Sequence, residues 1–426
     1  MFDNYRVKLA SDKKLKYEYC FILCLSVYII YSICDLIFCG ISALQWSVLD
    51  NGGDFIADFT NVIGYSAERD PYNHTIVYGL HEKAYPPLQY VFSYLISNTI
   101  SDKQHYYDIA NFTSMFNESK ITMLYIVFTC ITMICIFECI RSYKNGTNCI
   151  KTLTALCITL SFPFIFIIER GNSLLAVFLF IMFYFRFYND KNKLLRELSF
   201  ISLALAAAIK LTPAILGVLL LMERRWKEAI RTIIYGVILF FVPFSFFDGG
   251  FGNIPLFIRN LGLQLDKYKY EAGCTLKGYF LHYFPYFSAE NFNTLSAVCS
   301  VITIIVCVLM LFAAIFTHRK CDRLLYLCLI MIILPSHSGA YCIVYIVPAI
   351  IAFLNEDKEK KLILDKYIIL GGCFCFCEIG GYLGYSILNY HNGLLILVVY
   401  SVVKSVEVVS AFIKRKKNIK EISLKF

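Results

Sequence analysis

The chain has 426 residues, of which 58% are hydrophobic, 16% aromatic and only 17% charged. A soluble domain carries about a quarter charged residues, so this composition excludes a soluble domain. A helix that crosses a bilayer needs about 20 apolar residues, and the composition indicates a polytopic protein built from such helices. The net charge of +9 comes from short cationic clusters between apolar runs. That arrangement is typical of cytoplasmic loops and excludes a nucleic-acid-binding face.

The basic segment over residues 1–17 places the N-terminus in the cytoplasm. A first span is predicted within residues 18–40, followed by an external loop over residues 41–120. The apolar piece 87–100 of this loop is short for a crossing, so we expect it to lie along the interface or to dip in and return.

Residues 121–247 are predicted to hold the central spans. The apolar run 198–222 has cationic clusters at both ends, so both ends are expected in the cytoplasm. One helix cannot satisfy this, whereas two half-helices broken at residues 210–213 can, because Pro213 interrupts the helix there. This interpretation places Lys210 near membrane depth, facing a cavity.

A second external loop is predicted over residues 248–291, then C-terminal spans over residues 292–413 and a cytoplasmic tail over residues 414–426. The prediction is therefore an all-α polytopic membrane protein, a single integral-membrane domain over residues 1–426. It has about twelve membrane segments, with both termini in the cytoplasm.

The eighteen cysteines lie mostly within apolar runs, where cysteine behaves as a small hydrophobic residue. No cysteine spacing stands out as a metal site, and no glycine-rich nucleotide-binding loop is present. We expect neither a metal nor a cofactor.

With this topology, a set of polar residues converges at the outer rim of the helix bundle, and these residues are not explained as lipid-facing side chains. They are Asp54, Asp58, Tyr72, Tyr85, Glu169, Arg170, Lys210, His337 and Tyr341. Ionisable residues at membrane depth are costly and mark function. A carboxylate in such a cleft suits a general base, and the cations suit a phosphate.

Four of these residues have an alternative interpretation. Asp58 is also explained as a solvated or orienting partner of Asp54, and Glu169 as a salt-bridge partner of Arg170. The Lys210 side chain could equally extend to the membrane interface, and His337 could equally be an ordinary turn residue.

An ordered set of short motifs carries a family resemblance. They are Asp54-Phe55, Asp70-Pro71-Tyr72, Tyr85-Pro86-Pro87-Leu88, Arg170-Gly171-Asn172, and Ala206 to Pro213 followed by Arg224-Arg225-Trp226. The chain resembles the GT-C superfamily of integral-membrane glycosyltransferases, and most closely glycosyltransferase family 87, which includes polyprenol-phosphate-mannose-dependent mannosyltransferases. It departs from that family in its late segment, residues 334–341, which lacks the usual tryptophan.

The resemblance implies a GT-C-type bundle and an inverting transfer from a polyprenyl-phosphate sugar, mannose first, to a glycolipid or glycan hydroxyl. Asp54 would deprotonate the acceptor, and Arg170, Lys210 and His337 would bind the donor phosphate. Six further residues would bind or support the substrates: Asp58, Tyr72, Tyr85, Glu169, Asn172 and Tyr341. The expected location is a bacterial inner membrane, with the reaction on the outer face.

Three alternatives stay open. A polysaccharide polymerase would use an undecaprenyl-diphosphate-linked glycan, and it too has a dozen spans and large external loops. A transporter or flippase of lipid-linked sugars would distribute its polar groups through the bundle and show a repeat, and we find no internal repeat. In a lipid-binding scaffold without enzymatic activity, Asp54 could be replaced without loss of function.

Overall fold

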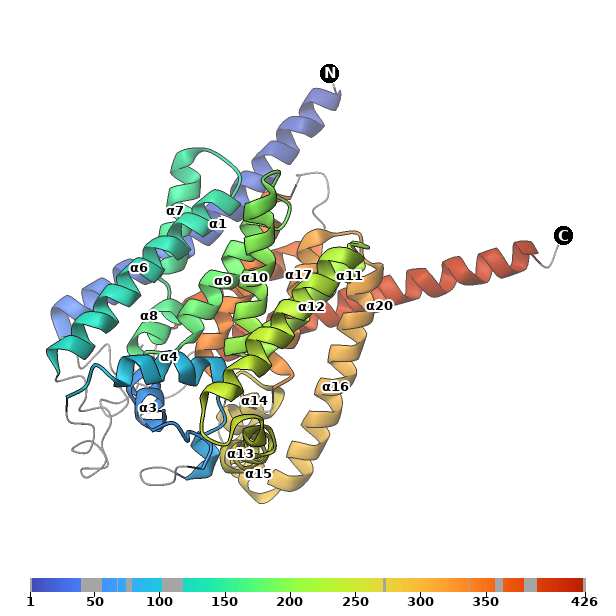
Figure 1. Cartoon of the computed structure of the whole chain (residues 1–426). Helices are drawn as coiled ribbons and strands as arrows, with labels where there is room; N and C mark the ends of the chain where they lie inside the picture. Colours follow the sequence, from blue (N-terminus) through green and yellow to red (C-terminus); the bar gives the residue numbers. More distant parts are fainter. Residues whose placement is uncertain are drawn as a thin grey trace. The chain divides into compact units, whose positions relative to one another are not determined.

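The computed structural model describes residues 2–39, 56–66, 68–73, 79–101, 118–270, 273–335, 337–356, 363–378 and 389–423. Every regular element in these ranges is an α-helix or a 3-10 helix (Figure 1), which confirms the predicted all-α class for this part of the chain. Asp54, the predicted general base, lies outside these ranges.

Several helices have the length and composition of membrane spans. In the described ranges, five qualify: Tyr17–Phe38 in α1 (Phe2–Cys39), α6 (Ser119–Tyr143), Trp226–Phe246, α16 (Phe292–Phe316) and Tyr390–Lys414 in α20 (Tyr390–Ser423). Shorter apolar helices cover Leu174–Phe187, Thr212–Met222 and Ala340–Asn355. The chain is therefore a membrane protein, and the total of about twelve segments stays a prediction.

Helix α12 (Trp226–Phe241) shows what makes these helices membrane helices. Its apolar side chains at spacings of three and four residues form one stripe: Ile230, Ile233, Ile234, Val237 and Ile238, each about half exposed or more. An apolar stripe at helical spacing normally packs into a core. Here it covers an exposed face, as expected for a surface in contact with lipid.

Two helix breaks fall at prolines. Helix α10 (Lys193–Ile209) ends before Lys210, and a 3-10 helix, η3 (Thr212–Gly217), follows, so the predicted break in this region is confirmed. A second break, within the region predicted to hold the central spans, separates α7 (Asn148–Thr159) from α8 (Phe162–Arg170). Pro163 explains it, because proline has no N–H to continue the hydrogen bonds of α7.

The chain divides into two units. Unit 2 comprises Cys34–Tyr143 and Phe162–Glu271. Besides α6, α8, α10, η3 and α12, its elements are α3 (Ala57–Tyr65), η1 (Leu80–Glu82), α4 (Pro87–Ser97), α9 (Leu174–Phe187), α11 (Val218–Met222), η4 (Val242–Phe246), η5 (Gly250–Gly252), α13 (Asn253–Lys267) and η6 (Tyr268–Tyr270). At 11 residues, α4 is about 16 Å long, too short for a hydrocarbon core of about 30 Å.

An aromatic core joins the two predicted external loops inside unit 2. Tyr72 and Tyr90 from the first loop pack with Phe244, Phe247 and Phe257 near the second. Much of the region predicted as the second external loop is thus helical, because the apolar side of α13 has this core to pack against.

Unit 1 comprises Met1–Ile33, Lys144–Ser161 and Ala272–Phe426. Besides the start of α1, α7, α16 and α20, its elements are α14 (Leu276–Tyr283), α15 (Pro285–Glu290), α17 (Lys320–Ile333), η7 (Ala340–Ile346), α18 (Val347–Asn355), η9 (Ile363–Asp365) and α19 (Lys366–Phe376). Every residue from Val347 to Leu354 is buried, so α18 is a core helix of this unit.

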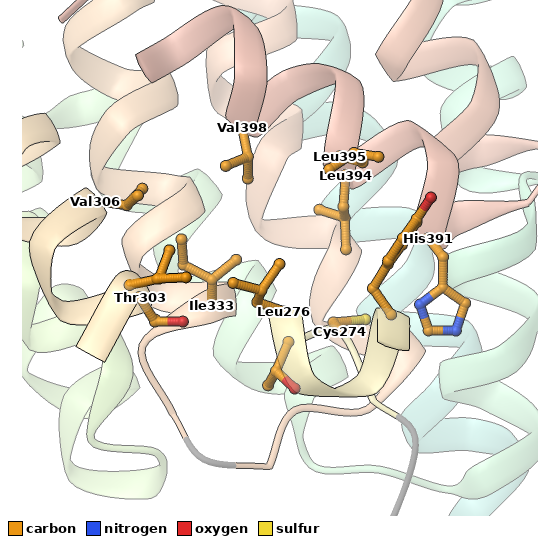
Figure 2. A pocket seen from close by; sticks show the side chains of 12 residues that line it. Cys274, Leu276, Thr303, Val306, Ile333, His391, Leu394, Leu395 and Val398 are labelled. Atoms are coloured by element: carbon orange, nitrogen blue, oxygen red, sulfur yellow. The ribbon is translucent and has the colours of Figure 1, made fainter. Parts of the chain in front are cut away.

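Unit 1 contains an apolar cavity between α14, α16, α17 and α20 (Figure 2).

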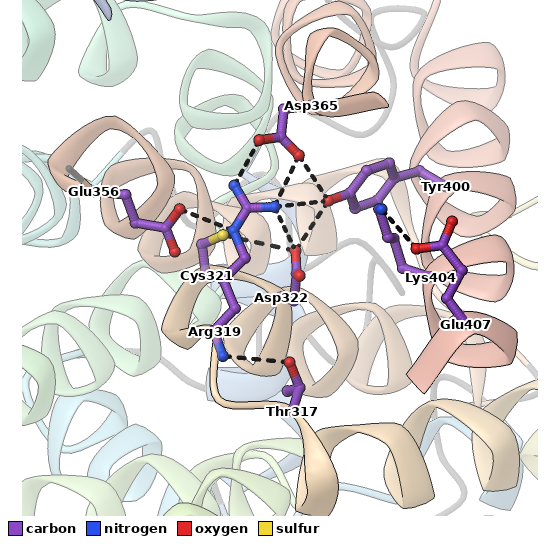
Figure 3. A network of polar contacts seen from close by, with 9 residues as sticks. All are labelled: Thr317, Arg319, Cys321, Asp322, Glu356, Asp365, Tyr400, Lys404 and Glu407. Carbon is purple, nitrogen blue, oxygen red and sulfur yellow. Dashed lines mark hydrogen bonds and ion pairs between the residues drawn. The ribbon is translucent and has the colours of Figure 1, made fainter. Parts of the chain in front are cut away.

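Unit 1 also contains a network of charged residues that connects four segments around Arg319 (Figure 3). The Arg319 guanidinium donates to both oxygens of Asp365 at 2.8 and 2.7 Å and to Glu356 at 2.9 Å. The hydroxyl of Tyr400 in α20 donates to Asp322 at 3.0 Å.

Candidate functional site

The first predicted site residues meet where α3 lies beside the link from α8 to α9. Asp58, in the first turn of α3, accepts a hydrogen bond from Arg170 Nη2 at 3.1 Å on one oxygen and from Asn172 Nδ2 at 2.6 Å on the other. Asn172 Oδ1 in turn accepts from the backbone N–H of Leu174 at 2.9 Å. The structure therefore brings together Asp58, Arg170 and Asn172 and fixes their orientation.

Close backbone approach makes this junction possible. The N–H of Ile56 donates to the carbonyl of Glu169 at 2.7 Å, and Gly171 has a φ of +65°. A Cβ on Gly171 would lie 2.8 Å from Phe59 Cβ and 3.2 Å from Ile56 Cα. Only glycine fits a left-handed position this close to another segment. In the Arg170-Gly171-Asn172 motif, the glycine thus allows the close contact with α3, and the arginine and asparagine supply the polar side chains.

A cavity of about 420 Å³ opens at this junction, entirely within unit 2. Its polar end is formed by Asp58, Gln89, Asn172 and Ser173, and Ser173 Oγ donates to Gln89 Oε1 at 3.3 Å. The rest of the wall is mainly apolar and includes Phe92, Leu95, Ile96, Leu124, Phe128, Leu175, Phe180 and Ile209. Such a shape, apolar along its length with a few polar groups at one end, suits an amphipathic ligand.

Positively charged groups lie close to the polar end of the cavity. Arg170 is 17% exposed, and its guanidinium donates to Asp58 at 3.1 Å beside the cavity. Helix α9 begins at Leu174, next to the cavity-lining Gly171, Asn172 and Ser173, and a helix N-terminus carries partial positive charge. Arg170 and the N-terminus of α9 therefore bring positive charge close to the polar end of the cavity, where Asp58 partly balances it.

Tyr72 and Tyr85 support this region from the side. Tyr72 is fully buried, and its hydroxyl donates to the carbonyl of Tyr85 at 3.1 Å, while burial raises the Tyr72 pKa. Asn260 of α13, also fully buried, donates to the carbonyls of Tyr72 at 2.8 Å and Lys83 at 3.2 Å. These bonds connect the first predicted external loop to the second.

Lys83 is an unusual buried cation in this supporting region. It is 1% exposed, and its Nζ lies 3.6 Å from the centre of the Tyr65 ring at the end of α3. Burial lowers the Lys83 pKa to about 7, although neighbouring Glu82 acts in the opposite direction. Lys83 therefore titrates in the neutral range instead of being permanently charged.

The remaining predicted site residues are distributed over both units. Glu169, 4% exposed, is in unit 2 at the end of α8, where its carbonyl accepts from Ile56. Lys210 follows α10 in extended conformation (φ −136°, ψ 127°), also in unit 2, and is half-buried. His337 and Tyr341 are in unit 1, where the carbonyl of the intervening Ser338 accepts from the Cys274 N–H at 2.6 Å.

The comparisons with known proteins decide the family. The sequence profile of glycosyltransferase family 87 matches residues 109–336, which is more than half of the chain. The chain belongs to glycosyltransferase family 87. The predicted resemblance is thereby confirmed, and the protein is a glycosyltransferase with membrane-spanning helices. No curated protein and no solved structure matches the chain.

The family 87 match includes part of the site. Arg170, Asn172 and Lys210 lie inside residues 109–336, whereas Asp58 precedes the match and His337 follows it directly. The polar end of the cavity therefore combines residues inside the matched region with Asp58 and Gln89 from the segment before it.

Sequence reasoning missed several residues of this region. Gln89 and Ser173 line the polar end, and Asn260 and Lys83 hold the supporting loop. Gln89 had a usable signal, since it follows the Tyr85-Pro86-Pro87-Leu88 motif in the first turn of α4. Lys83 and Asn260 had none, because a single polar residue in a polar loop is normally solvated.

Within the described ranges, no group of three or more His, Cys, Asp or Glu side chains has an arrangement that would hold a metal ion.

Proposed function

We propose that this family 87 protein is an inverting glycosyltransferase that uses a polyprenyl-phosphate sugar, with mannose as the first candidate sugar. The acceptor is a hydroxyl of a glycolipid or polysaccharide at the outer face of a bacterial inner membrane. The cavity of unit 2 is the main support: an apolar space of about 420 Å³ ends at Asp58, Asn172 and Ser173, beside Arg170. A lipid phosphate has the same division into an apolar chain and an anionic head.

In the proposed reaction, the carboxylate of Asp54 takes the proton of the acceptor hydroxyl. The acceptor oxygen forms a bond to the anomeric carbon, and the bond from that carbon to the phosphate oxygen breaks. Polyprenyl phosphate leaves with the bonding electron pair and one more negative charge on its phosphate. Groups that bind this charge more strongly than the ground state accelerate the step.

Arg170 is the proposed principal phosphate ligand, assisted by the N-terminus of α9, with Lys210 and His337 as further cationic ligands. Asp58 holds the Arg170 guanidinium through the contact at 3.1 Å and orients Asn172 through that at 2.6 Å. We therefore assign Asp58 to the positioning of Arg170 and Asn172, and we assign Glu169, whose carbonyl accepts from Ile56, to the support of the same junction. Tyr85 and Tyr341 are the proposed sugar-side aromatic residues, and Tyr72, which is buried in the aromatic core, supports Tyr85.

The test is transfer of radiolabelled sugar by purified protein from a panel of polyprenyl-phosphate sugars, led by the mannose donor, to lipid and glycan acceptors. Wild type should transfer from one donor, and Asp54→Asn should abolish transfer with folding intact. Asp70→Asn is the matched control, because within the described ranges the contact of the Asp70 carboxylate is a hydrogen bond from Asn73 in an exposed turn. Full activity in Asp54→Asn would refute the assignment of the base.

Two further outcomes separate the remaining roles. Arg170→Gln should lower kcat by about 100-fold or more if Arg170 binds the leaving phosphate. Transfer from undecaprenyl-diphosphate glycan, with none from any polyprenyl monophosphate sugar, would overturn the proposed donor and indicate the polymerase reaction.

A further inference from the structure

The apolar cavity of unit 1 has a volume of about 120 Å³, and none of the residues assigned to transfer lines it. Leu276, Val306, Ile333, Leu394 and Val398 line it from α14, α16, α17 and α20 (Figure 2). An apolar cavity of about 150 Å³ stays dry and binds a hydrocarbon such as benzene, because water there lacks hydrogen-bond partners. Along its apolar part, this cavity therefore suits a short stretch of hydrocarbon chain.

The cavity adjoins the membrane-facing side of α16. Its lining residue Ile302 is 42% exposed, and Val301 and Ile305 beside it are 57% and 60% exposed on a helix with the composition of a membrane span. A chain that enters between α16 and α20 would come directly from the hydrocarbon of the bilayer.

The end of the cavity nearest the start of α20 carries unused hydrogen-bonding groups. His391 is 4% exposed, lines the cavity, and makes ring contacts but no hydrogen bond with the described part of the chain. Its ring stacks on His282 at 4.6 Å, and the Nε2 atom of His282 is buried with no partner in the described ranges. Burial lowers the pKa of His282, which disfavours the charged form of that imidazole. A buried imidazole without a hydrogen-bond partner is destabilising, so a ligand that supplies an acceptor is favoured here.

The order of these groups along α20 identifies the ligand class. The candidate span begins at Tyr390, so His391 lies at its boundary, and Leu394 and Val398 lie one and two turns deeper. The distance from His391 to Val398 is about 10 Å along the helix. A glycerophospholipid has the same order, with ester carbonyls at the boundary of the hydrocarbon layer and acyl chains below. The cavity wall contains no lysine or arginine, so an ester suits it better than a carboxylate or phosphate.

We propose that unit 1 contains a site for one acyl chain of a bilayer glycerophospholipid, whose ester carbonyl accepts a hydrogen bond from His391. The site is independent of the proposed transfer reaction and of its donor.

The proposal can be tested by photo-crosslinking in phosphatidylethanolamine–phosphatidylglycerol vesicles doped with phosphatidylethanolamine that carries a diazirine in the middle of one acyl chain. Peptide mapping should place adducts on residues 394–398 of α20. Val306→Trp fills the cavity and should reduce these adducts at least fivefold. Ile305→Trp is the matched control, since Ile305 is 60% exposed outside the cavity, and it should leave them unchanged. Equal labelling of residues 394–398 in both variants would overturn the proposal.

Two additional measurements address the hydrogen bond and the source of the chain. His391→Phe keeps an aromatic ring but removes the N–H, and it should reduce the adducts severalfold. An excess of polyprenyl monophosphate should leave the wild-type adducts in place, and their loss would assign the cavity to an isoprenoid chain instead. If Val306→Trp does not fold, Thr303→Phe fills the same cavity from the same helix. Native mass spectrometry of the wild type should then show one retained phospholipid per chain, and its absence would refute the site.

Discussion

Gly171→Ala tests the close approach on which the candidate site is built. The new Cβ would lie 2.8 Å from Phe59 Cβ, 3.2 Å from Ile56 Cα and 3.3 Å from the Ile56 carbonyl oxygen. A φ of +65° costs a non-glycine residue about 1–2 kcal/mol, and the forced displacement of packed atoms adds about 1–3 kcal/mol. The free energy of unfolding should therefore fall by about 2–5 kcal/mol.

The displacement should also move Asp58 away from Arg170 and Asn172, since Phe59 follows Asp58 directly. We expect transfer activity to fall at least tenfold, with a lower apparent Tm. Thermal unfolding in detergent can be followed with a thiol-reactive dye, because buried cysteines such as Cys328 become accessible only on unfolding.

Two variants make this prediction specific. Gly262→Ala introduces the same methyl group in helix α13, where no atom lies within 4 Å of the new Cβ, so stability should stay equal or rise by up to about 1 kcal/mol. Phe59→Ala retains the colliding Cβ and should not rescue Gly171→Ala, whereas Phe59→Gly removes that contact. If Gly171→Ala unfolds within 0.5 kcal/mol of wild type, a margin of about the size typical for surface substitutions, the described approach of α3 to residue 171 is wrong.

Three further predictions concern the supporting structure. Burial lowers the Lys83 pKa to about 7, below its value in the unfolded chain, so the free energy of unfolding should increase as pH rises from about 7 to 10. Lys83→Met should abolish this contribution when unfolding is measured as a function of pH. Asp365→Asn should lower the free energy of unfolding by about 3–5 kcal/mol, because Asp365 is fully buried against Arg319. Glu407→Gln, at the half-exposed end of the ion pair with Lys404, should change it by less than about 1 kcal/mol in the same assay. Tyr72→Phe removes the hydrogen bond to Tyr85 and should cost about 1–3 kcal/mol in thermal unfolding, and an unchanged Tm would contradict that structural role.

The class of the protein and several of its elements follow from the sequence by itself. Apolar runs of about 20 residues form helices in any membrane protein, since the bilayer provides no other partner for the backbone. Pro213 marks the break after α10 for an equally local reason, the missing N–H. The family was also visible in short motifs such as Arg170-Gly171-Asn172, because each motif is contiguous in the chain.

Only the tertiary structure decided which polar groups meet. Asp58 contacts Arg170 and Asn172 across 112 and 114 residues of sequence, and Tyr72 is held by Asn260 across 188. Contacts of this kind depend on how helices pack, and a local pattern of polar and apolar residues contains no information about the partner. For the same reason, the sequence could present Tyr72 as a candidate sugar-binding residue, whereas the structure places its ring in an aromatic core.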